Sequence, residues 1–272
     1  MSLKFDKCEV IVDNKKIIAD SASLSEETST QPAYVIGHKN IIDQPPVGGL
    51  RNSLQLNYLM ETNNEPNYYI ISGLKESNGS DSPVVISIGG ITGSYYLDGY
   101  NFSITPNNLV KVNASYISYE NLTGNFSEQS SSVGYNLLNN SGLAHYWTTT
   151  AISNPDLTST GSVISFNYNF KPNWEPIYAI GKPSPLQVSL INAQENFDIA
   201  TETLTHIPFS GKTPTSFFND FNSFKLKNIS TLWGDTENSL TFDLESGIVT
   251  SNKVEITQDN VILVNTTVNK YY

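Results

Sequence analysis

Apolar and polar residues alternate along two segments of the chain, and a short polar turn interrupts each of them. The first segment spans residues 102–116 and breaks at Pro106-Asn107-Asn108; the second spans residues 254–268 and breaks at Gln258-Asp259-Asn260. A period of two is typical of a half-buried strand, and Asn and Asp favour the turns of hairpins. The pattern therefore predicts a β-hairpin in each segment. The apolar positions are Phe102, Ile104, Val110, Val112, Ala114 and Tyr116 in the first, and Val254, Ile256, Ile262, Val264 and Val268 in the second.

A second pair of alternating segments, residues 19–25 and 163–170, predicts a further strand in each half of the chain. Both strands run toward a signature of the form Pro-x-Tyr-x-Ile-Gly. It occurs at Pro32–Gly37 and again at Pro176–Gly181, an offset of 144.

Proline-led segments predict one short helix in each half. Thr213 is a good N-cap and Pro214 suits the first helical position. One face of that helix would carry Phe217, Phe218, Phe221 and Phe224. In the first half, Pro66 opens a shorter helix with Tyr69, Ile70 and Leu74 on one face. Each half is thus expected to contain several strands, one short helix and a closing hairpin.

The matching segments indicate an internal duplication. Residues 96–119 align without a gap on residues 248–271, an offset of 152, and six of the 24 pairs are identical. The proline-led segments match at the intermediate offset of 148. Offsets that grow by small insertions are what an old duplication leaves behind. The alternative is that two β-rich, Asn-rich segments align this well by chance.

We therefore expect a mainly β protein made of two tandem β-sandwich or barrel domains, each with one short helix. The expected boundaries are a first domain at 1–124, a polar linker or arm at 125–161 and a second domain at 162–272. Tyr146 and Trp147 interrupt the polar segment, so part of it is expected to pack on a domain or on a neighbouring chain.

Composition narrows the class of protein. Only 15% of the 272 residues are charged, and the net charge is −11, which argues against a basic face for nucleic acid or anionic lipid. No apolar run approaches eighteen residues, so no membrane partner is expected, and the first ten residues show no signal-peptide pattern. Cys8 is the single cysteine, which fits a reducing compartment and excludes an intramolecular disulfide.

The sequence carries no recognisable catalytic, metal or cofactor motif, so we expect a protein that is not an enzyme and has no cofactor. His38, His145 and His206 lack zinc-ligand spacing. The Gly211-Lys212-Thr213 tripeptide has His206 where a phosphate-binding loop needs its first glycine. The segment around Gly89 and Gly90 has no basic partner and predicts a turn or a bulge.

Scattered acidic residues offer one weak alternative to that view. Asp235, Glu237, Asp243 and Glu245 flank a predicted strand and would hold a weak cation at most; a solvated strand face is the simpler interpretation.

The closing hairpins carry a resemblance to a known family. The segment from Gly93 through Tyr100-Asn101-Phe102 to Tyr119, and its second copy at 246–271, resemble the last hairpin of the bacteriophage tail-tube fold in a tandem, two-domain form. The resemblance implies a virion structural protein of the tail tube, neck or baseplate, assembled in the host cytoplasm. Its implied partners are further copies of itself and other virion proteins, with DNA in passage only. Three chains would close a ring of pseudo-sixfold symmetry, and an acidic lumen would repel DNA.

Two Pro-rich loops are the candidate ring-stacking surfaces within that resemblance. They span residues 40–51 and 182–192, and their aliphatic residues are Ile41, Ile42, Val47 and Leu50 in the first and Leu186 and Val188 in the second. Aliphatic residues in loops usually bury themselves against something. The alternative is that they bury against the same chain.

Two other functions stay open at this level. A receptor- or glycan-binding virion appendage would use exposed aromatics such as Tyr95, Tyr96, Tyr146 and Trp147, and a capsid-associated decoration protein would share the same fold. A hydrolase ranks below both, because no nucleophile and base stand in a recognised pattern.

Overall fold

The computed structural model describes residues 8–28, 33, 49–60, 65–76, 82–105, 110–126, 146–152, 161–203, 223–229, 238–243, 248–256 and 262–272. As predicted, the chain is mainly β. These residues contain one helix, α1 (Pro66–Lys75), which confirms the helix predicted after Pro66. Its predicted face is wrong, because Tyr69 is exposed and Ile71 is buried together with Leu74. The strands are β1 (Cys8–Val12), β2 (Lys15–Glu27), β3 (Arg51–Leu59), β4 (Val84–Ile88), β5 (Ile91–Ile104), β6 (Lys111–Ser118), β7 (Thr123–Gly124), β8 (Tyr146–Ile152), β9 (Gly161–Ile177), β10 (Gln187–Thr203), β11 (Ser223–Ile229), β12 (Asn238–Asp243), β13 (Ile248–Ile256) and β14 (Ile262–Tyr271).

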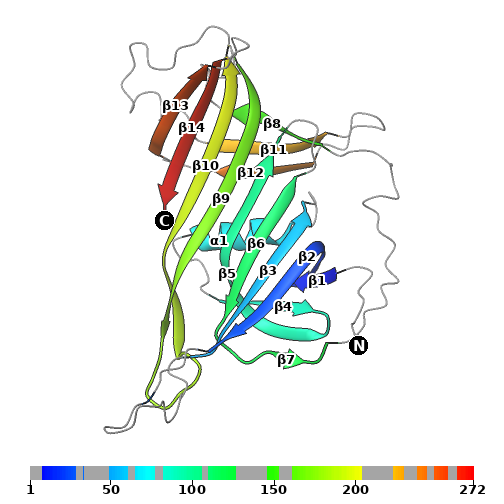
Figure 1. Cartoon of the computed structure of the whole chain (residues 1–272), viewed down its shortest axis with the longest axis vertical. Coiled ribbons are helices and arrows are strands. Elements are labelled where there is room, and N and C mark those ends of the chain that lie inside the picture. Colours follow the sequence, from blue (N-terminus) through cyan, green and yellow to red (C-terminus); the bar gives the residue numbers. More distant parts are fainter. Residues whose placement is uncertain are drawn as a thin grey trace.

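Six strands of the first half close into an antiparallel barrel, in the order β5-β4-β1-β2-β3-β6 with β6 returning to β5. The barrel occupies the lower part of Figure 1. Because the barrel closes, each of its six strands pairs with a neighbour on both sides along part of its length. The apolar positions that the alternation of the first hairpin predicted are confirmed as core residues: Phe102, Ile104, Val110, Val112, Ala114 and Tyr116 are all buried.

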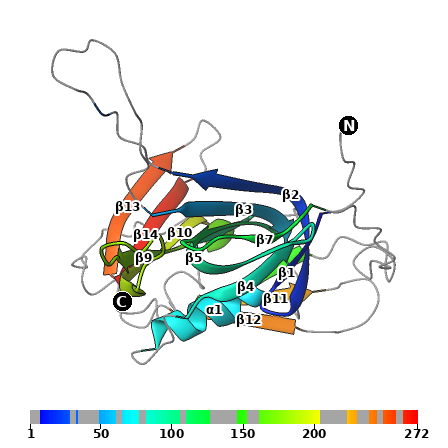
Figure 2. The same cartoon turned by 90° about the horizontal axis from the view of Figure 1, so that it is seen from below.

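Tight turns close two of the barrel hairpins. Asp13 and Asn14 both have positive φ between β1 and β2, and Gly89 and Gly90 do the same between β4 and β5. Figure 2 views these barrel strands from below. Two-residue turns with positive φ at both positions match the twist of paired strands, and Asn, Asp and Gly are the residues that tolerate them. The turn predicted at Gly89-Gly90 is therefore confirmed.

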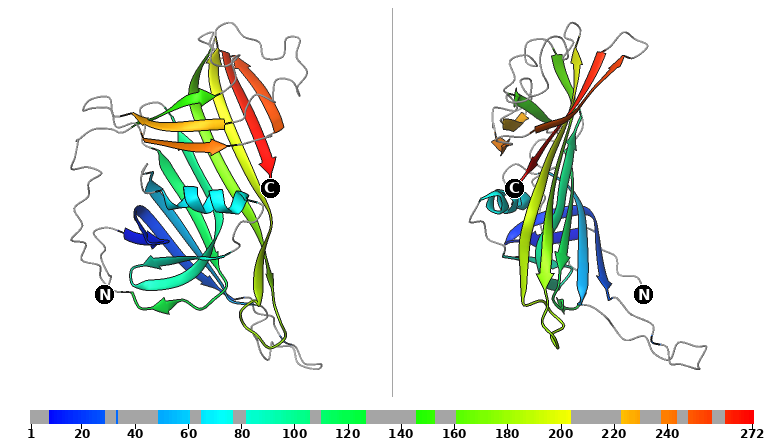
Figure 3. Two further views of the ribbon diagram at one scale, coloured as in Figure 1. Left: turned by 180° about the vertical axis from the view of Figure 1, so that it is seen from behind. Right: turned by 90° about the vertical axis from the view of Figure 1, so that its left-hand side faces the viewer.

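The second half extends the same sheet instead of closing a second barrel among the residues described. Strand β9 pairs with β5, and β10, β14 and β13 follow in order, so the sheet rises above the barrel (Figure 1). A separate three-stranded sheet, β12-β11-β8, lies with α1 on one face of the long sheet, as Figure 3 shows. Phe242 of β12 contacts the rings of Tyr68, Phe102 and Tyr168, which joins α1, β5 and β9 in one core.

The prediction of a helix after Pro214 is wrong for its last apolar residue, Phe224. Residues 204–222 lie outside the described residues, but Phe224 belongs to β11, where it stands opposite Phe242 of β12. Phe224 and Leu226 also satisfy a period of two, so strand pairing competes successfully with the helical spacing of the phenylalanines.

Four strands of the second half repeat the order of four strands of the first. The first half pairs β2-β3-β6-β5, the second pairs β9-β10-β14-β13, and every pairing is antiparallel. The equivalent strands are thus β2 and β9, β3 and β10, β6 and β14, and β5 and β13.

Two bulges of the second half fall at positions equivalent to bulges of the first, and a further one, between Leu190 and Asn192 of β10, has no counterpart in the β2–β3 pairing. The β5–β6 pairing shifts register between Leu97 and Gly99, and the β13–β14 pairing shifts between Val249 and Ser251. The β2–β3 pairing shifts between Ala19 and Ser21, and in the β9–β10 pairing β9 shifts between Val163 and Ser165. The first pair of bulges is related by the offset of 152 and the second by the offset of 144, as in the sequence matches. Bulges are specific features of a fold, so their repetition supports an internal duplication.

Candidate assembly surface

The tip of the β9–β10 hairpin, residues 177–186, carries a cluster of exposed apolar side chains. The hairpin projects beyond the barrel at the lower end of Figure 1. Ile180 is fully exposed at 106%, and the other members are Ile177 (48%), Tyr178 (42%) and Leu186 (66%). Exposed apolar residues are common singly, but four of them on one projecting hairpin tip make it a candidate interaction surface.

A glycine-dependent turn presents Ile180. The amide of Lys182 donates to the carbonyl oxygen of Ala179 over 3.1 Å, and Gly181 has φ +80°. This is the arrangement of a type II turn, which requires positive φ at its third residue and places Ile180 at its second. The amide of Leu186 donates to the carbonyl oxygen of Ile177 over 2.8 Å and closes the tip. The Ile-Gly pair of the repeated signature is therefore the turn itself.

The base of the tip is anchored to the barrel. Val188 is buried and packs with Ile117 and Tyr119, which lie at and just after the end of β6. The indole Nε1 of Trp174 donates to the carbonyl oxygen of Leu97 over 2.7 Å. The exposed tip is thus carried on a packed base and does not depend on its own contacts for its position.

The described end of the first predicted stacking loop lies beside the hairpin tip. A methyl group added at Gly49 would collide with the ring of Tyr178, so the chain just before β3 touches the chain just after β9. Partial burial raises the pKa of Tyr178, and the nearby Arg51 opposes that rise. The loop ends from the two halves therefore meet at one end of the molecule.

The predicted stacking residues divide into three groups. Leu186 is exposed at the tip, Leu50 is half-buried and Val188 is buried within the chain. Ile41, Ile42 and Val47 lie outside the described residues. Sequence reasoning missed the three exposed members just before the loop, Ile177, Tyr178 and Ile180. The Pro-x-Tyr-x-Ile-Gly signature contains all three residues and could have pointed to them. It was used only as evidence for the duplication and was not interpreted as a surface.

Among the described residues, the outer edges of β13 and of part of β2 have no pairing partner, and neither do the outer edges of β8 and β12 in the smaller sheet. The outer edge of β13 pairs with nothing there, because its only partner is β14 on the other side. Strand β2 pairs with β1 through residues 15–19 and leaves the same edge of residues 20–27 open. An unpaired edge exposes backbone donors and acceptors and can add a further strand.

A groove of about 460 Å³ runs beside the base of the tip, where β9 separates from β5. Charged side chains (Arg51, Asp98, Lys171) and aromatic ones (Tyr119, Trp174, Tyr271) line it. Trp174 is already engaged through its indole N–H and through the ring of Tyr96, whose centroid is 4.8 Å away.

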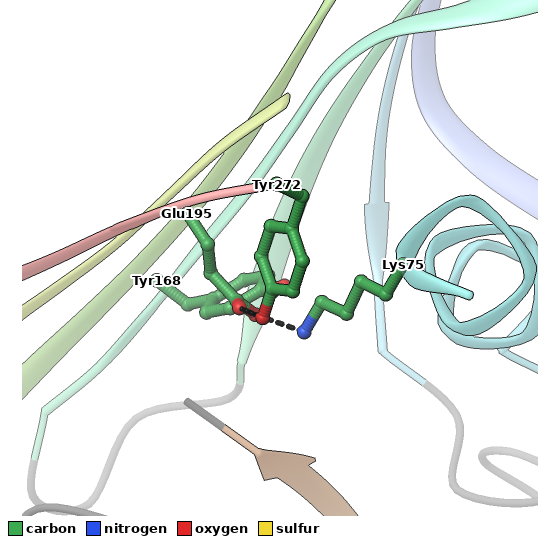
Figure 4. A network of polar contacts seen from close by, with 4 residues as sticks. All are labelled: Lys75, Tyr168, Glu195 and Tyr272. Carbon is green, nitrogen blue, oxygen red and sulfur yellow. Dashed lines mark hydrogen bonds and ion pairs between the residues drawn. The ribbon is translucent and has the colours of Figure 1, made fainter. Parts of the chain in front are cut away.

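A buried polar network ties the two halves together (Figure 4). Glu195 of β10 has a fully buried side chain and accepts hydrogen bonds from the hydroxyl groups of Tyr168 (2.6 Å) and Tyr272 (2.5 Å). It also forms an ion pair with Lys75 at the end of α1. Burial, and then the negative charge of Glu195, raise the pKa of Tyr168 well above its ordinary value. Because three donors engage both oxygens of the carboxylate, the arrangement is that of a structural anchor.

The residues considered for chemistry fall largely outside the described part of the chain. This holds for His38, His145, His206, the Gly211-Lys212-Thr213 tripeptide and, of the acidic group, Asp235, Glu237 and Glu245. Within the described residues, no group of three or more potential ligands gathers to hold a metal ion. The single helix described there is too short to cross a membrane.

The aromatic residues considered for a sugar platform lie in two different sheets. Tyr95 is 1% exposed and belongs to the barrel core, so its assignment to an exposed surface is wrong. Tyr96 packs against Trp174 and Tyr119. Tyr146 and Trp147 lie in β8, which pairs with β11, so this part of the polar segment does pack on the fold.

Comparisons with models of protein families and with curated proteins find no match to this chain.

Proposed function

We propose that this chain is a non-enzymatic structural subunit of a phage virion that self-associates into a ring for DNA passage in the tail tube, neck or baseplate. The observation that carries the proposal is the β5–β9 pairing, which joins two halves of like strand order edge to edge. A unit that already joins its own repeat in this way has the geometry to continue the series with other chains. Two tandem tail-tube-like units in each of three chains would give six units around the ring.

Surface features agree with this function. The open edges of β13 and β2 supply the means of lateral association, and the exposed tip around Ile180 supplies a surface for stacking one ring on the next. The net charge of −11 suits a conduit that must not retain DNA.

Mass measurement and imaging of the full chain test the proposal. We expect closed particles of about 90 kDa, three chains of 30.0 kDa each, and stacked rings at higher concentration. A chain that stays a monomer at every concentration would contradict the function.

A matched pair of variants tests the stacking role of the tip. Ile180→Asp is expected to leave single rings intact and to abolish stacking, because a charge would replace the apolar contact. Val85→Asp is the control, since Val85 is also exposed (56%) but lies on β4 of the barrel. If rings of the two variants stack equally well, the tip has no role in stacking and that part of the proposal is wrong.

The groove beside the tip favours a second candidate, a glycan-binding appendage. Its mixture of charged and aromatic lining residues suits a polar ligand of this kind. Tyr271 is 68% exposed at its rim and is the residue to test. A monomer that binds glycans, and loses that binding in Tyr271→Ala, would favour this function over the ring.

A further inference from the structure

The junction between the two halves is a strand pairing of defined register. Residues 100–104 of β5 run antiparallel to residues 166–170 of β9, with Phe102 opposite Tyr168 at the centre. The rings of these two residues stack with their centroids 5.1 Å apart. The junction therefore combines backbone pairing with an apolar inner face.

The duplication assigns an equivalent to each side of this junction. The bulges place β13 at an offset of 152 from β5, and β9 at an offset of 144 from β2. The equivalents of residues 100–104 are thus residues 252–256, and those of residues 166–170 are residues 22–26. Neither of these two segments has a partner on its outer edge in the described part of the chain.

We propose that β13 of one chain pairs antiparallel with β2 of a second copy, in the register of the β5–β9 junction. This inference rests on the proposed self-association and adds the strands and residues that carry it. The predicted opposite residues are Asn252 and Glu26, Lys253 and Ser25, Val254 and Leu24, Glu255 and Ser23, and Ile256 and Ala22.

The residue types at these positions suit a strand pairing. The register sets Val254 opposite Leu24 and Ile256 opposite Ala22, where the junction within the chain has Phe102 opposite Tyr168 and Ile104 opposite Phe166. Opposed apolar residues on one face are the unit of sheet stabilisation. The smaller side chains would bury less apolar area than the aromatic pairs, so the contact between chains is weaker than the junction within one.

The opposite face of the proposed pairing is polar and carries complementary charge. Ser23 and Ser25 are exposed on β2, and Lys253 and Glu255 keep 68% and 43% of their side chains exposed on β13. The register sets Lys253 diagonal to Glu27, a spacing that long side chains can bridge. No pair of like charges stands directly opposite in this register.

Each chain would offer β13 to one neighbour and β2 to another, so the contact is head to tail. Head-to-tail contacts make a closed ring when the rotation between copies divides the circle, and a filament when it does not. Because each chain already spans two of the repeated units, three chains complete six.

Disulfide trapping in the full chain tests the register. Cys8, the single native cysteine, is first replaced by Ala; Ser23→Cys and Glu255→Cys are then introduced together. Opposite residues on paired strands have Cα atoms about 4.5–5.5 Å apart, within the range for a disulfide. The matched control combines Glu27→Cys with Glu255→Cys, because a shift of four positions along a strand separates the sulfur atoms by about 13 Å.

Mild oxidation is expected to cross-link the first pair at least about tenfold more than the control, with a ladder that ends at three chains. Particles that form normally but cross-link both pairs equally, or neither, would overturn the register and leave the ring function standing. A ladder that continues past three chains would overturn closure at three. A monomer by mass measurement, before any oxidation, would instead remove the proposed function itself.

Discussion

Asn52 of β3 and Glu195 of β10 are equivalent residues of the two halves, and both side chains are fully buried. Asn52 stands opposite Ser118 of β6, and Glu195 stands opposite Lys270 of β14, the position that the offset of 152 makes equivalent to Ser118. Each one also holds the chain just after the closing hairpin of its own half. Asn52 donates from Nδ2 to the carbonyl oxygen of Glu120 over 2.8 Å, and Glu195 accepts from the hydroxyl of Tyr272, which the same offset makes equivalent to Glu120.

Replacing Asn52 or Glu195 by alanine is expected to lower the free energy of unfolding by different amounts. Glu195→Ala is expected to lower the free energy of unfolding by about 3–5 kcal/mol, because it leaves the partly buried Lys75 ammonium and the buried Tyr168 hydroxyl without their partner. Asn52→Ala loses a neutral hydrogen bond and is expected to cost about 1–3 kcal/mol. Urea denaturation measures both. Glu120→Ala, whose side chain is exposed, is the control and should leave the midpoint unchanged.

Buried tyrosines predict alkaline unfolding. Burial raises the pKa of Tyr95 from 10.0 to about 12, and burial with nearby acidic groups raises the pKa of Tyr58, Tyr100 and Tyr168 well above 10.0. Between the unfolded and folded pKa values the folded chain binds more protons, so the free energy of unfolding falls as the pH rises. Stability is therefore present in full below about pH 10 and is lost above it. Tyrosinate absorbance and circular dichroism should change together; titration of all tyrosines in a chain that stays folded would contradict this.

The buried position of Val112 predicts that the barrel does not tolerate a charged side chain that points into its core. It is 1% exposed and stands between Tyr58 of β3 and Phe102 of β5. Val112→Asp buries an unpaired carboxylate and is expected to unfold the barrel, a loss above about 4 kcal/mol. Lys111→Asp, at the exposed neighbouring position, should stay folded by circular dichroism. A folded Val112→Asp variant would mean that the inward and outward faces of β6 are misassigned.

Replacement of Gly73 and of Gly181 by alanine is expected to change the stability of the protein in opposite directions. Gly73 lies within α1 and Gly181 lies in the tip turn at φ +80°, and a methyl group at either meets nothing within 4 Å. Gly73→Ala is expected to raise the free energy of unfolding by about 0.5–1 kcal/mol through helix propensity. Gly181→Ala is expected to lower it by about 1–2 kcal/mol, because alanine is strained in the left-handed region. Thermal unfolding compares them; a Gly181→Ala variant as stable as the parent chain, or more stable, would refute the type II turn.

Several features of the fold could be predicted from local patterns of the sequence. The alternation around Val112 identified the buried face of the first closing hairpin, and Pro66 marked the helix that the structure contains. The sequence offsets of 144 and 152 recur as the positions of the bulges. These features were accessible because the period of a strand, the cap of a helix and the spacing of repeats depend on residues that are near each other along the chain.

The candidate surface was only partly accessible in this way. Leu186 was recognised because a loop aliphatic is unusual, but nothing local distinguishes it from Val188, which is buried against Ile117 and Tyr119 from the other half. Ile180 escaped because its exposure depends on the turn that Gly181 makes and on the projection of the hairpin.

The amino-acid order alone determined the two strands of the first closing hairpin, which of their faces is buried, and the offsets at which the two halves match. Only the tertiary structure decided that β5 closes the barrel with β6 and also pairs with β9, and that Glu195 meets Lys75 from across the chain. The physical reason is that side-chain alternation specifies the faces of a strand, whereas its edges carry the same amide and carbonyl groups at nearly every residue. The choice of edge partner is therefore made by the packing of whole sheets.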